Sequence, residues 1–156
     1  MFLIKKVVNK LLKKKLTISF AESCTGGLIS SSITSIPNAS KIFKMGLITY
    51  SNKSKNKLLK IKKKTLLKYG AVSEPVCYMM VNNLGKIART DIALSVTGIA
   101  GPNGGTPKKP VGLVYLGIKK GNKIKVKKYI FKNRGRAYIQ KITLNKSLKL
   151  ILSVIK

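Results

Sequence analysis

The sequence predicts one three-layer α/β/α domain with a mixed, mostly parallel sheet. Two patterns predict this fold class: helical segments alternate with short apolar runs typical of buried strands, and a hairpin pattern follows the last of these runs. The chain has 156 residues, about the length of one domain, and 44% of them are hydrophobic, so it can bury a core. We therefore expect a single domain over residues 1–156.

The first part of the chain is expected to alternate helix and strand. Residues 1–15 place apolar side chains at helical spacing between lysines, which predicts an amphipathic helix. Residues 16–21 form a β-rich run, and the turn over residues 22–27 opens a helix that Pro37 ends. A second strand is expected over residues 46–50.

Capping residues mark the helices in the middle of the chain. Ser51 is a good N-cap for the helix that follows it, and Gly70 closes a short helix over residues 63–69. Ser73 is followed by an acid and a proline, which indicates a helix start, and that helix runs to about residue 88. The remaining expected elements are a buried strand, a Gly-rich loop, two hairpin strands and a final helix, over residues 91–96, 97–105, 111–118, 123–131 and 136–155.

The charge of the chain is strongly unbalanced. It has 33 Lys and Arg residues against 3 Asp and Glu residues, a formal net charge of +30, which predicts non-specific binding to nucleic acids. Two interpretations stay open: a selected polyanion-binding surface, or lysine-rich drift of the composition. Drift is favoured because only three of the basic residues are Arg, the residue that contacts bases and phosphates with two hydrogen bonds, and because the lysines are spread over the chain.

Missing residue types exclude several kinds of site. The chain has no His, which rules out Ser-His-Asp and Cys-His catalysis and any zinc site that needs His. Its two cysteines, Cys24 and Cys77, cannot build a four-thiolate cluster and are expected to be buried thiols in a reducing compartment. With only Glu22, Glu74 and Asp91 as acids, paired-carboxylate catalysis and a carboxylate-rich metal site are not expected either. We expect no metal and no cofactor.

The apolar runs are too short for a membrane-spanning helix. Lysines interrupt each run before it reaches the roughly 18 residues needed to cross a bilayer, and no small-residue cleavage site follows the first helix. These features predict a cytoplasmic protein without a membrane partner. Binding of the basic first helix to a membrane surface stays an alternative.

Three polar or Gly-rich segments follow predicted strands. They are the turn at Ser23, the junction at Tyr50 and Ser51, and the loop over residues 97–105. Because ligands bind at the carboxyl ends of strands in open α/β sheets, one pocket can collect all three segments.

Five short motifs, taken in order, closely resemble the CinA C-terminal family. They are AESCTGG at 21–27, TYSN at 49–52 with Lys55 after it, GAVSEP at 70–75, TGIAGP at 97–102 and KPVG at 109–112. The resemblance covers about residues 5 to 150. The family includes stand-alone nicotinamide-nucleotide amidohydrolases. Its larger members carry an N-terminal domain related to molybdopterin-binding proteins, for which these 156 residues have no room.

The resemblance implies hydrolysis of the carboxamide of nicotinamide mononucleotide to nicotinate mononucleotide and ammonia, with catalytic residues Ser23, Tyr50 and Lys55. The residues are suited to this chemistry, because a Ser activated by a neutral Lys, directly or through Tyr, can attack an amide without His or metal. A positive neighbourhood lowers the pKa of such a lysine. Each residue also has an ordinary structural interpretation: Ser23 or Thr25 as a helix cap, Cys24 as a packed thiol, Tyr50 as a rim aromatic and Lys55 as a solvated lysine.

The expected substrate-binding residues come from the same motifs, except Arg136, which stands at the start of the last expected helix. Gly26 and Gly27 open a helix whose backbone amides can hold a phosphate, and Thr97 and Gly98 are expected to line the pocket as oxyanion or ribose contacts. The full expected set is Glu22, Thr25, Gly26, Gly27, Thr97, Gly98, Gly101 and Arg136.

The segment before the last helix departs from the family's Phe-x-Gly-Asp-Arg pattern. It is FKNRGR at 131–136, and Gln140 stands near the place of a second Arg. Arg136 is expected to keep the role of the first Arg. Glu22 is expected to orient Lys55 or backbone amides rather than act as a base, and the other two acids are expected to be structural.

A second class of function stays open, a non-catalytic CinA-like protein that binds nucleic acids non-specifically. The aromatic content of 6%, with no Trp, argues against a surface that stacks bases. The expected partners are a small nucleotide substrate and further copies of the chain in a homo-oligomer.

Overall fold

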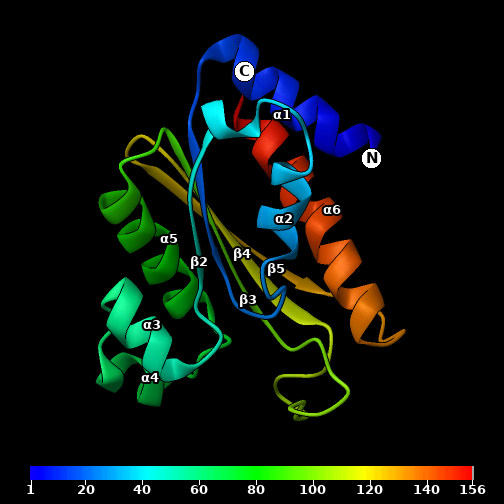
Figure 1. Ribbon diagram of the computed structural model, residues 1–156. Helices are drawn as coiled ribbons and strands as arrows, with labels where there is room; N and C mark the ends of the chain where they lie inside the picture. The colour runs from blue at the N-terminus through cyan, green and yellow to red at the C-terminus, as the bar shows by residue number, and fades with distance from the viewer. Residues whose placement is uncertain (156) are drawn as a thin grey trace.

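A five-stranded sheet forms the middle layer of the computed structural model, which describes residues 1–155 (Figure 1). Its strands are β1 Ile18–Glu22, β2 Phe43–Ile48, β3 Ile92–Gly98, β4 Leu113–Lys120 and β5 Lys123–Ile130. Their order across the sheet is β2-β1-β3-β4-β5. The first three pair in parallel, β4 is antiparallel to β3, and β5 is antiparallel to β4, so β4 alone runs against the others.

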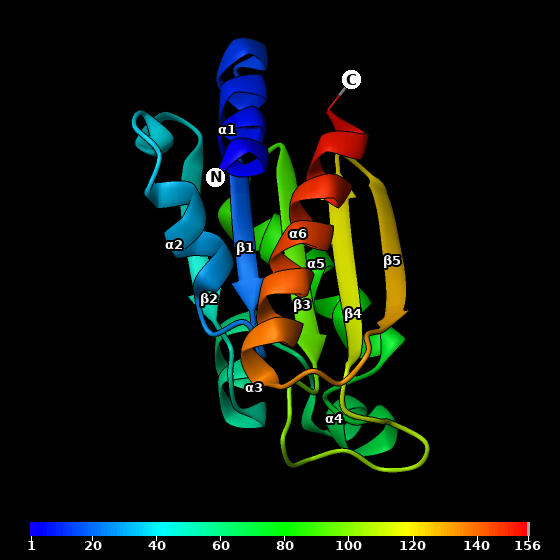
Figure 2. The same cartoon turned by 90° about the vertical axis from the view of Figure 1, so that its right-hand side faces the viewer.

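Helices cover both faces of this sheet (Figures 1 and 2). One face carries α1 Phe2–Lys14, α2 Leu28–Thr34 and α6 Arg136–Val154. The other carries α3 Asn52–Leu59, α4 Lys63–Tyr69 and α5 Glu74–Ala88. The expected three-layer α/β/α fold with a mixed sheet is therefore confirmed. No helix within residues 1–155 has both the length and the apolar content needed to cross a bilayer.

Each face of the sheet has its own hydrophobic core. The larger core joins β1 and β3 to α1, α2 and α6 through side chains such as Leu11, Phe20 and Ile139. The smaller core packs α5 on the opposite face, with Met80 and Leu84 buried at its centre. Because β1 and β3 are covered on both faces, nearly all their residues are buried, as parallel strands inside α/β domains require.

The caps predicted for α3 and α5 agree with the structure. Ser51 accepts a hydrogen bond from the Ser54 amide at 3.0 Å and begins α3, and Ser73 accepts one from the Val76 amide at 3.4 Å and begins α5. The bounds predicted for α4, residues 63–69 followed by Gly70, are those observed.

Strand β2 differs from the prediction. It covers Phe43–Ile48, whereas residues 46–50 were expected. The difference has a tertiary cause, because pairing with β1 begins at Phe43 opposite Ile18 and continues to Ile48 opposite Glu22. Thr49 and Tyr50 consequently lie beyond the end of the strand, at the edge of the sheet where the candidate site is found.

Candidate active site

Ser23 lies at the carboxyl edge of the sheet, directly after β1. Its amide donates to the Val96 carbonyl of β3 at 3.1 Å, which fixes the start of the turn that follows. Only 7% of the residue is exposed. Ser23, the nucleophile expected from the sequence, is therefore almost completely buried, and its backbone is held by a hydrogen bond to β3.

Lys55 approaches Ser23 from the neighbouring helix α3. Its Nζ donates to Ser23 Oγ at 3.0 Å and to the Thr49 carbonyl at 2.7 Å. The residue is 1% exposed, although it is a lysine. Burial disfavours the charged ammonium and lowers the pKa of Lys55 from 10.5 to about 8. The Ser51 cap starts α3 at the register that points this side chain inward.

The Glu22 carboxylate is surrounded by hydrogen-bond donors, an environment that does not suit a general base. Its carboxylate accepts hydrogen bonds from the Thr25 hydroxyl at 2.7 Å, the Gly27 and Ile29 amides at 3.1 Å, and both the amide and hydroxyl of Ser30. Five donors thus surround one buried carboxylate. Glu22 orients backbone amides, one of its two expected roles, and makes no hydrogen bond to Lys55 among the described residues.

This carboxylate bears on two expectations about α2, its cap and the binding of a substrate phosphate, of which the second stays a prediction. Neither Ser23 nor Thr25 caps the helix, because Glu22 accepts from its first amides instead. The amides of Gly26 and Gly27, expected to hold a substrate phosphate, are paired inside the chain with the Ser23 carbonyl and with Glu22. The Glu22 carboxylate thus lies at the positive end of the helix, where the substrate phosphate was expected.

Tyr50 is at the rim of the site. It is 58% exposed, and its hydroxyl accepts a hydrogen bond from Arg136 at 2.6 Å. Arg136, at the start of α6, also donates to the Gly101 carbonyl at 2.9 Å. Tyr50 makes no hydrogen bond with Ser23 or Lys55 within residues 1–155, so the structure joins two of the three expected catalytic residues directly and places the third with Arg136.

Thr97 and Gly98 form the end of β3, the strand that pairs with β1. The Thr97 hydroxyl donates to the Ala71 carbonyl at 2.8 Å, and the residue is 1% exposed. A Cβ on Gly98 would lie 2.8 Å from the Leu113 carbonyl oxygen and 3.1 Å from Cys24 Sγ. Gly98 therefore has a packing role here: it leaves room for Leu113 and Val114 of β4 and for the Cys24 side chain.

Cys24 is a packed thiol, as expected. It is 6% exposed, and burial raises the pKa of its thiol to about 12, so the reactive thiolate is disfavoured. Its carbonyl accepts a hydrogen bond from the Gln140 side chain at 2.9 Å.

Two contacts of the site were not identified from the sequence. Gln140, noted only as a departure from the family pattern, ties α6 to the turn after Ser23 through the Cys24 carbonyl. Thr49, part of a motif but given no role, supplies the carbonyl that holds Lys55. Backbone acceptors carry no side-chain pattern, so neither contact had a sequence signal. Within residues 1–155, no three Cys, Asp or Glu side chains gather as metal ligands would.

Comparison with known proteins identifies the family. Residues 2–155 match the family described as the CinA C-terminal domain. The chain belongs to this family. A CinA-like protein of Kosmotoga olearia is 58% identical over 122 residues, which are 78% of this chain and 30% of that protein. A CinA-like protein of Prochlorococcus marinus strain MIT 9301 is 49% identical over 151 residues, 94% of this chain and 36% of that protein.

The fold comparison agrees with the family. The crystal structure of the competence/damage inducible protein CihA from Agrobacterium tumefaciens matches with a TM-score of 0.96 and 34% identity, over 99% of this chain and 94% of that one. The chain spans about a third of the length of the curated relatives named above. The activities of those longer proteins are therefore only proposals for this chain.

Proposed function

We propose that the protein is an amidohydrolase that converts nicotinamide mononucleotide and water to nicotinate mononucleotide and ammonia. One observation carries the proposal: the buried Lys55 amine lies 3.0 Å from the Ser23 hydroxyl. A lysine removed from water beside a serine is a suitable general base for a nucleophilic hydroxyl. The membership in the CinA C-terminal domain family supports the choice of substrate, which the family resemblance implies.

Lys55 acts as the base in its neutral form. With a pKa of about 8, roughly a tenth of Lys55 is neutral at pH 7, against about one molecule in 3,000 for a lysine with a pKa of 10.5. The hydrogen bond to the Thr49 carbonyl keeps the amine beside Ser23. Lys55 takes the Ser23 proton while Ser23 Oγ bonds to the carboxamide carbon.

The next steps return that proton. The C–N bond breaks as protonated Lys55 gives its proton to the departing nitrogen, which leaves as ammonia. A water molecule then gives a proton to Lys55 and attacks the ester carbon on Ser23. The Ser23–acyl bond breaks, Ser23 regains its proton from Lys55, and the product acid ionises in solution.

The turn after Ser23 offers a donor for the oxyanion. The Thr25 hydroxyl is held by Glu22, but its backbone N–H has no acceptor within residues 1–155. A free amide in the turn after a nucleophile can stabilise the negative oxygen of the tetrahedral intermediate. Glu22 keeps the turn in this shape because its contacts span Thr25 to Ser30.

Arg136 is proposed to bind the substrate phosphate. It is an exposed cation at the rim, and α6 carries it one helical turn before Gln140, which contacts the turn after Ser23. A phosphate that binds Arg136 competes with Tyr50 for the guanidinium, because Tyr50 is its partner in the structure. Release of Tyr50 from this contact frees its hydroxyl to serve Ser23, Lys55 or the substrate.

The experiment measures ammonia release from nicotinamide mononucleotide by wild type and by two matched pairs of variants. Ser23→Ala and Lys55→Met are expected to lower turnover at least a thousandfold. Ser40→Ala and Lys53→Met are their controls, since both residues are exposed, and both variants should keep most of the activity. Lys53 is exposed and two residues from Lys55. Comparison of Lys55→Met with Lys53→Met therefore separates the loss of the buried amine from the loss of a positive charge on α3.

Normal turnover by Ser23→Ala would eliminate the serine mechanism. Absence of ammonia release by wild type, together with salt-sensitive binding to DNA that Ser23→Ala leaves unchanged, would instead support the non-catalytic nucleic-acid-binding alternative.

A further inference from the structure

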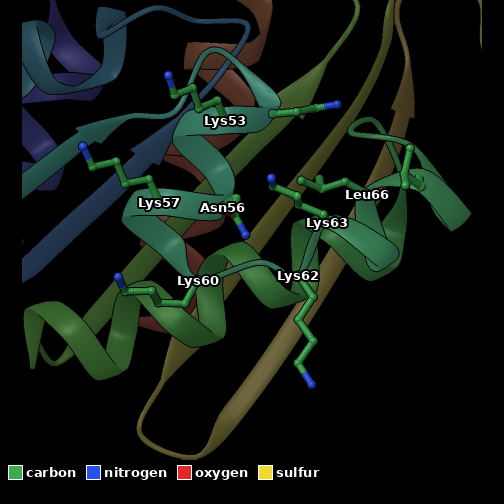
Figure 3. Close-up of a pocket in the computed structure, with 9 residues that line it drawn as sticks. Lys53, Asn56, Lys57, Lys60, Lys62, Lys63 and Leu66 are labelled. Carbon is green, nitrogen blue, oxygen red and sulfur yellow. The ribbon is translucent and has the colours of Figure 1, made fainter.

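A groove lies between α3 and α4 (Figure 3). Its volume is about 840 Å³. Nine residues line it, and five of them are lysines, whereas lysines make up about one residue in five of the whole chain. The five are Lys53, Lys57, Lys60, Lys62 and Lys63. The other four are two asparagines and two leucines.

No acidic side chain within residues 1–155 lines this groove. Glu22 is buried against α2, Glu74 is in the first turn of α5, and Asp91 accepts from Thr17 at the far end of the sheet. None of the five groove ammonium groups donates a hydrogen bond to another group in residues 1–155. Within residues 1–155, five lysines outside the groove do donate such a bond, as Lys109 does to the Tyr69 carbonyl at 2.8 Å.

The lysines are arranged along the helices. Lys53 and Lys57 are four residues apart on α3, and Lys60 follows at its end. Figure 3 shows these three side chains extending to the left of α3, with Lys63 of α4 pointing toward α3 and Lys62 pointing away from it. Like charges at this spacing destabilise a helix, so an anion that binds several of them at once stabilises the helix pair.

We propose that this groove binds a compact oligophosphate, a linear anion of two or three phosphate groups. A volume of this size suits a small ligand. The eight-residue α3 is only about 12 Å long, which fits a short anion better than the continuous track that a nucleic acid follows. Lysines supply point charges for phosphate, and no aromatic or Arg residue lines the groove to stack or contact a base.

A second hollow provides a contrast. It lies at the other end of the sheet and contains Lys120 and Asp91 among its lining residues. There a carboxylate is present, and the Lys120 ammonium donates to the Val154 carbonyl at 2.7 Å. This hollow also holds Arg89, Lys123, Lys125 and Lys127, so the feature that distinguishes the α3–α4 groove from it is a lining without any acidic residue.

The test is calorimetric titration of inorganic tripolyphosphate into the full chain at 0.15 M salt, about physiological ionic strength. One variant carries Lys53→Gln, Lys57→Gln and Lys63→Gln, and a matched control carries Lys5→Gln, Lys6→Gln and Lys13→Gln on α1. Each variant removes the same charge from helical positions, and Gln keeps helix propensity. We expect one-to-one binding by wild type, at least tenfold weaker binding by the groove variant, and less than a twofold change in the control.

The other results decide against the proposal. Equal weakening in both variants would show that only the net charge matters, and absence of one-to-one binding would show that no oligophosphate site exists. Tighter binding of a thymidine 20-mer that displaces tripolyphosphate would assign the groove to nucleic acid. Titration of ATP distinguishes two kinds of natural ligand. If ATP binds as tightly as tripolyphosphate, the groove binds the phosphate chain of a nucleotide. If ATP binds more weakly, the groove binds free oligophosphate. Thermal unfolding of both variants verifies that they fold.

Discussion

The Lys55 ammonium lies 3.0 Å from the Ser23 hydroxyl, although 32 positions separate the two residues in the chain. Strand pairing makes this contact possible. Parallel β1 and β2 end side by side, with the Thr49 amide donating to the Glu22 carbonyl at 2.8 Å, so the turn after β1 faces the helix after β2. The carbonyl of Thr49 then holds the lysine in place.

The first prediction concerns the pH dependence of turnover. The base must be neutral, and the pKa of Lys55 is lowered to about 8, so kcat/KM should rise with pH and level off above that value. Below it, the rate falls about tenfold per pH unit. Steady-state rates between pH 6 and 10 measure this limb. A limb centred near 10.5 would show that Lys55 is an ordinary solvated lysine or is not the base.

The second prediction concerns stability. The pKa of Lys55 is lower in the folded chain than in the unfolded chain, so the folded state binds fewer protons between about pH 8 and 10.5, and stability rises with pH across this window. Lys55→Met should therefore stabilise the fold at pH 7 by up to roughly 3 kcal/mol, with an advantage that shrinks as pH rises to 10.5. Urea unfolding at several pH values measures it. Lys53→Met is the control and should show no such trend; a Lys55→Met variant less stable than wild type at pH 7 would contradict the argument.

The third prediction concerns the buried carboxylate. Glu22→Gln replaces an acceptor-only group with one whose amide faces protein donors, so the free energy of unfolding should fall by about 2 kcal/mol or more. Glu74→Gln, an exposed acid in the first turn of α5, should cost less than about 1 kcal/mol. Denaturant unfolding compares the two. Equal losses would mean that the five donors around Glu22 contribute little.

The fourth prediction concerns substrate recognition by Arg136. Arg136→Gln should raise KM for nicotinamide mononucleotide at least tenfold and leave KM for nicotinamide riboside, which has no phosphate, nearly unchanged. The matched control is Arg134→Gln, because Arg134 lies over the Tyr138 ring at 5.5 Å instead of at Tyr50. A parallel loss on both substrates would assign Arg136 to positioning Tyr50 and not to the phosphate.

The fifth prediction concerns Gly98. A methyl group there would meet the Leu113 carbonyl oxygen at 2.8 Å, and backbone cannot move aside easily, so Gly98→Ala should destabilise the fold by about 1–3 kcal/mol. Gly121→Ala has nothing within 4 Å of the new Cβ and should cost about 1 kcal/mol for its positive φ of 56°. The two midpoints of thermal unfolding are compared. An unaffected Gly98→Ala protein would leave contact with substrate as the reason for this glycine.

Much of the fold follows from local patterns. Helix α4 and the caps of α3 and α5 could be predicted because a cap is a local interaction between residues a few positions apart. Strand β2 could not be bounded in this way, because its limits come from pairing with β1. The start of α2 could not be predicted locally either. Its first amides donate to Glu22, which lies before the turn, and not to a residue at the usual cap position.

The sequence by itself determined the fold class, the family resemblance and the short set of residues able to act without His. Only the tertiary structure decided which of those residues lie together in the buried site and which lie at its rim. It buried Lys55 against Ser23, placed Tyr50 with Arg136 at the rim, and gave the α2 amides to Glu22. The physical reason is that burial and hydrogen-bond partners depend on which strands lie side by side, and that arrangement sets both the pKa of a lysine and the availability of an amide.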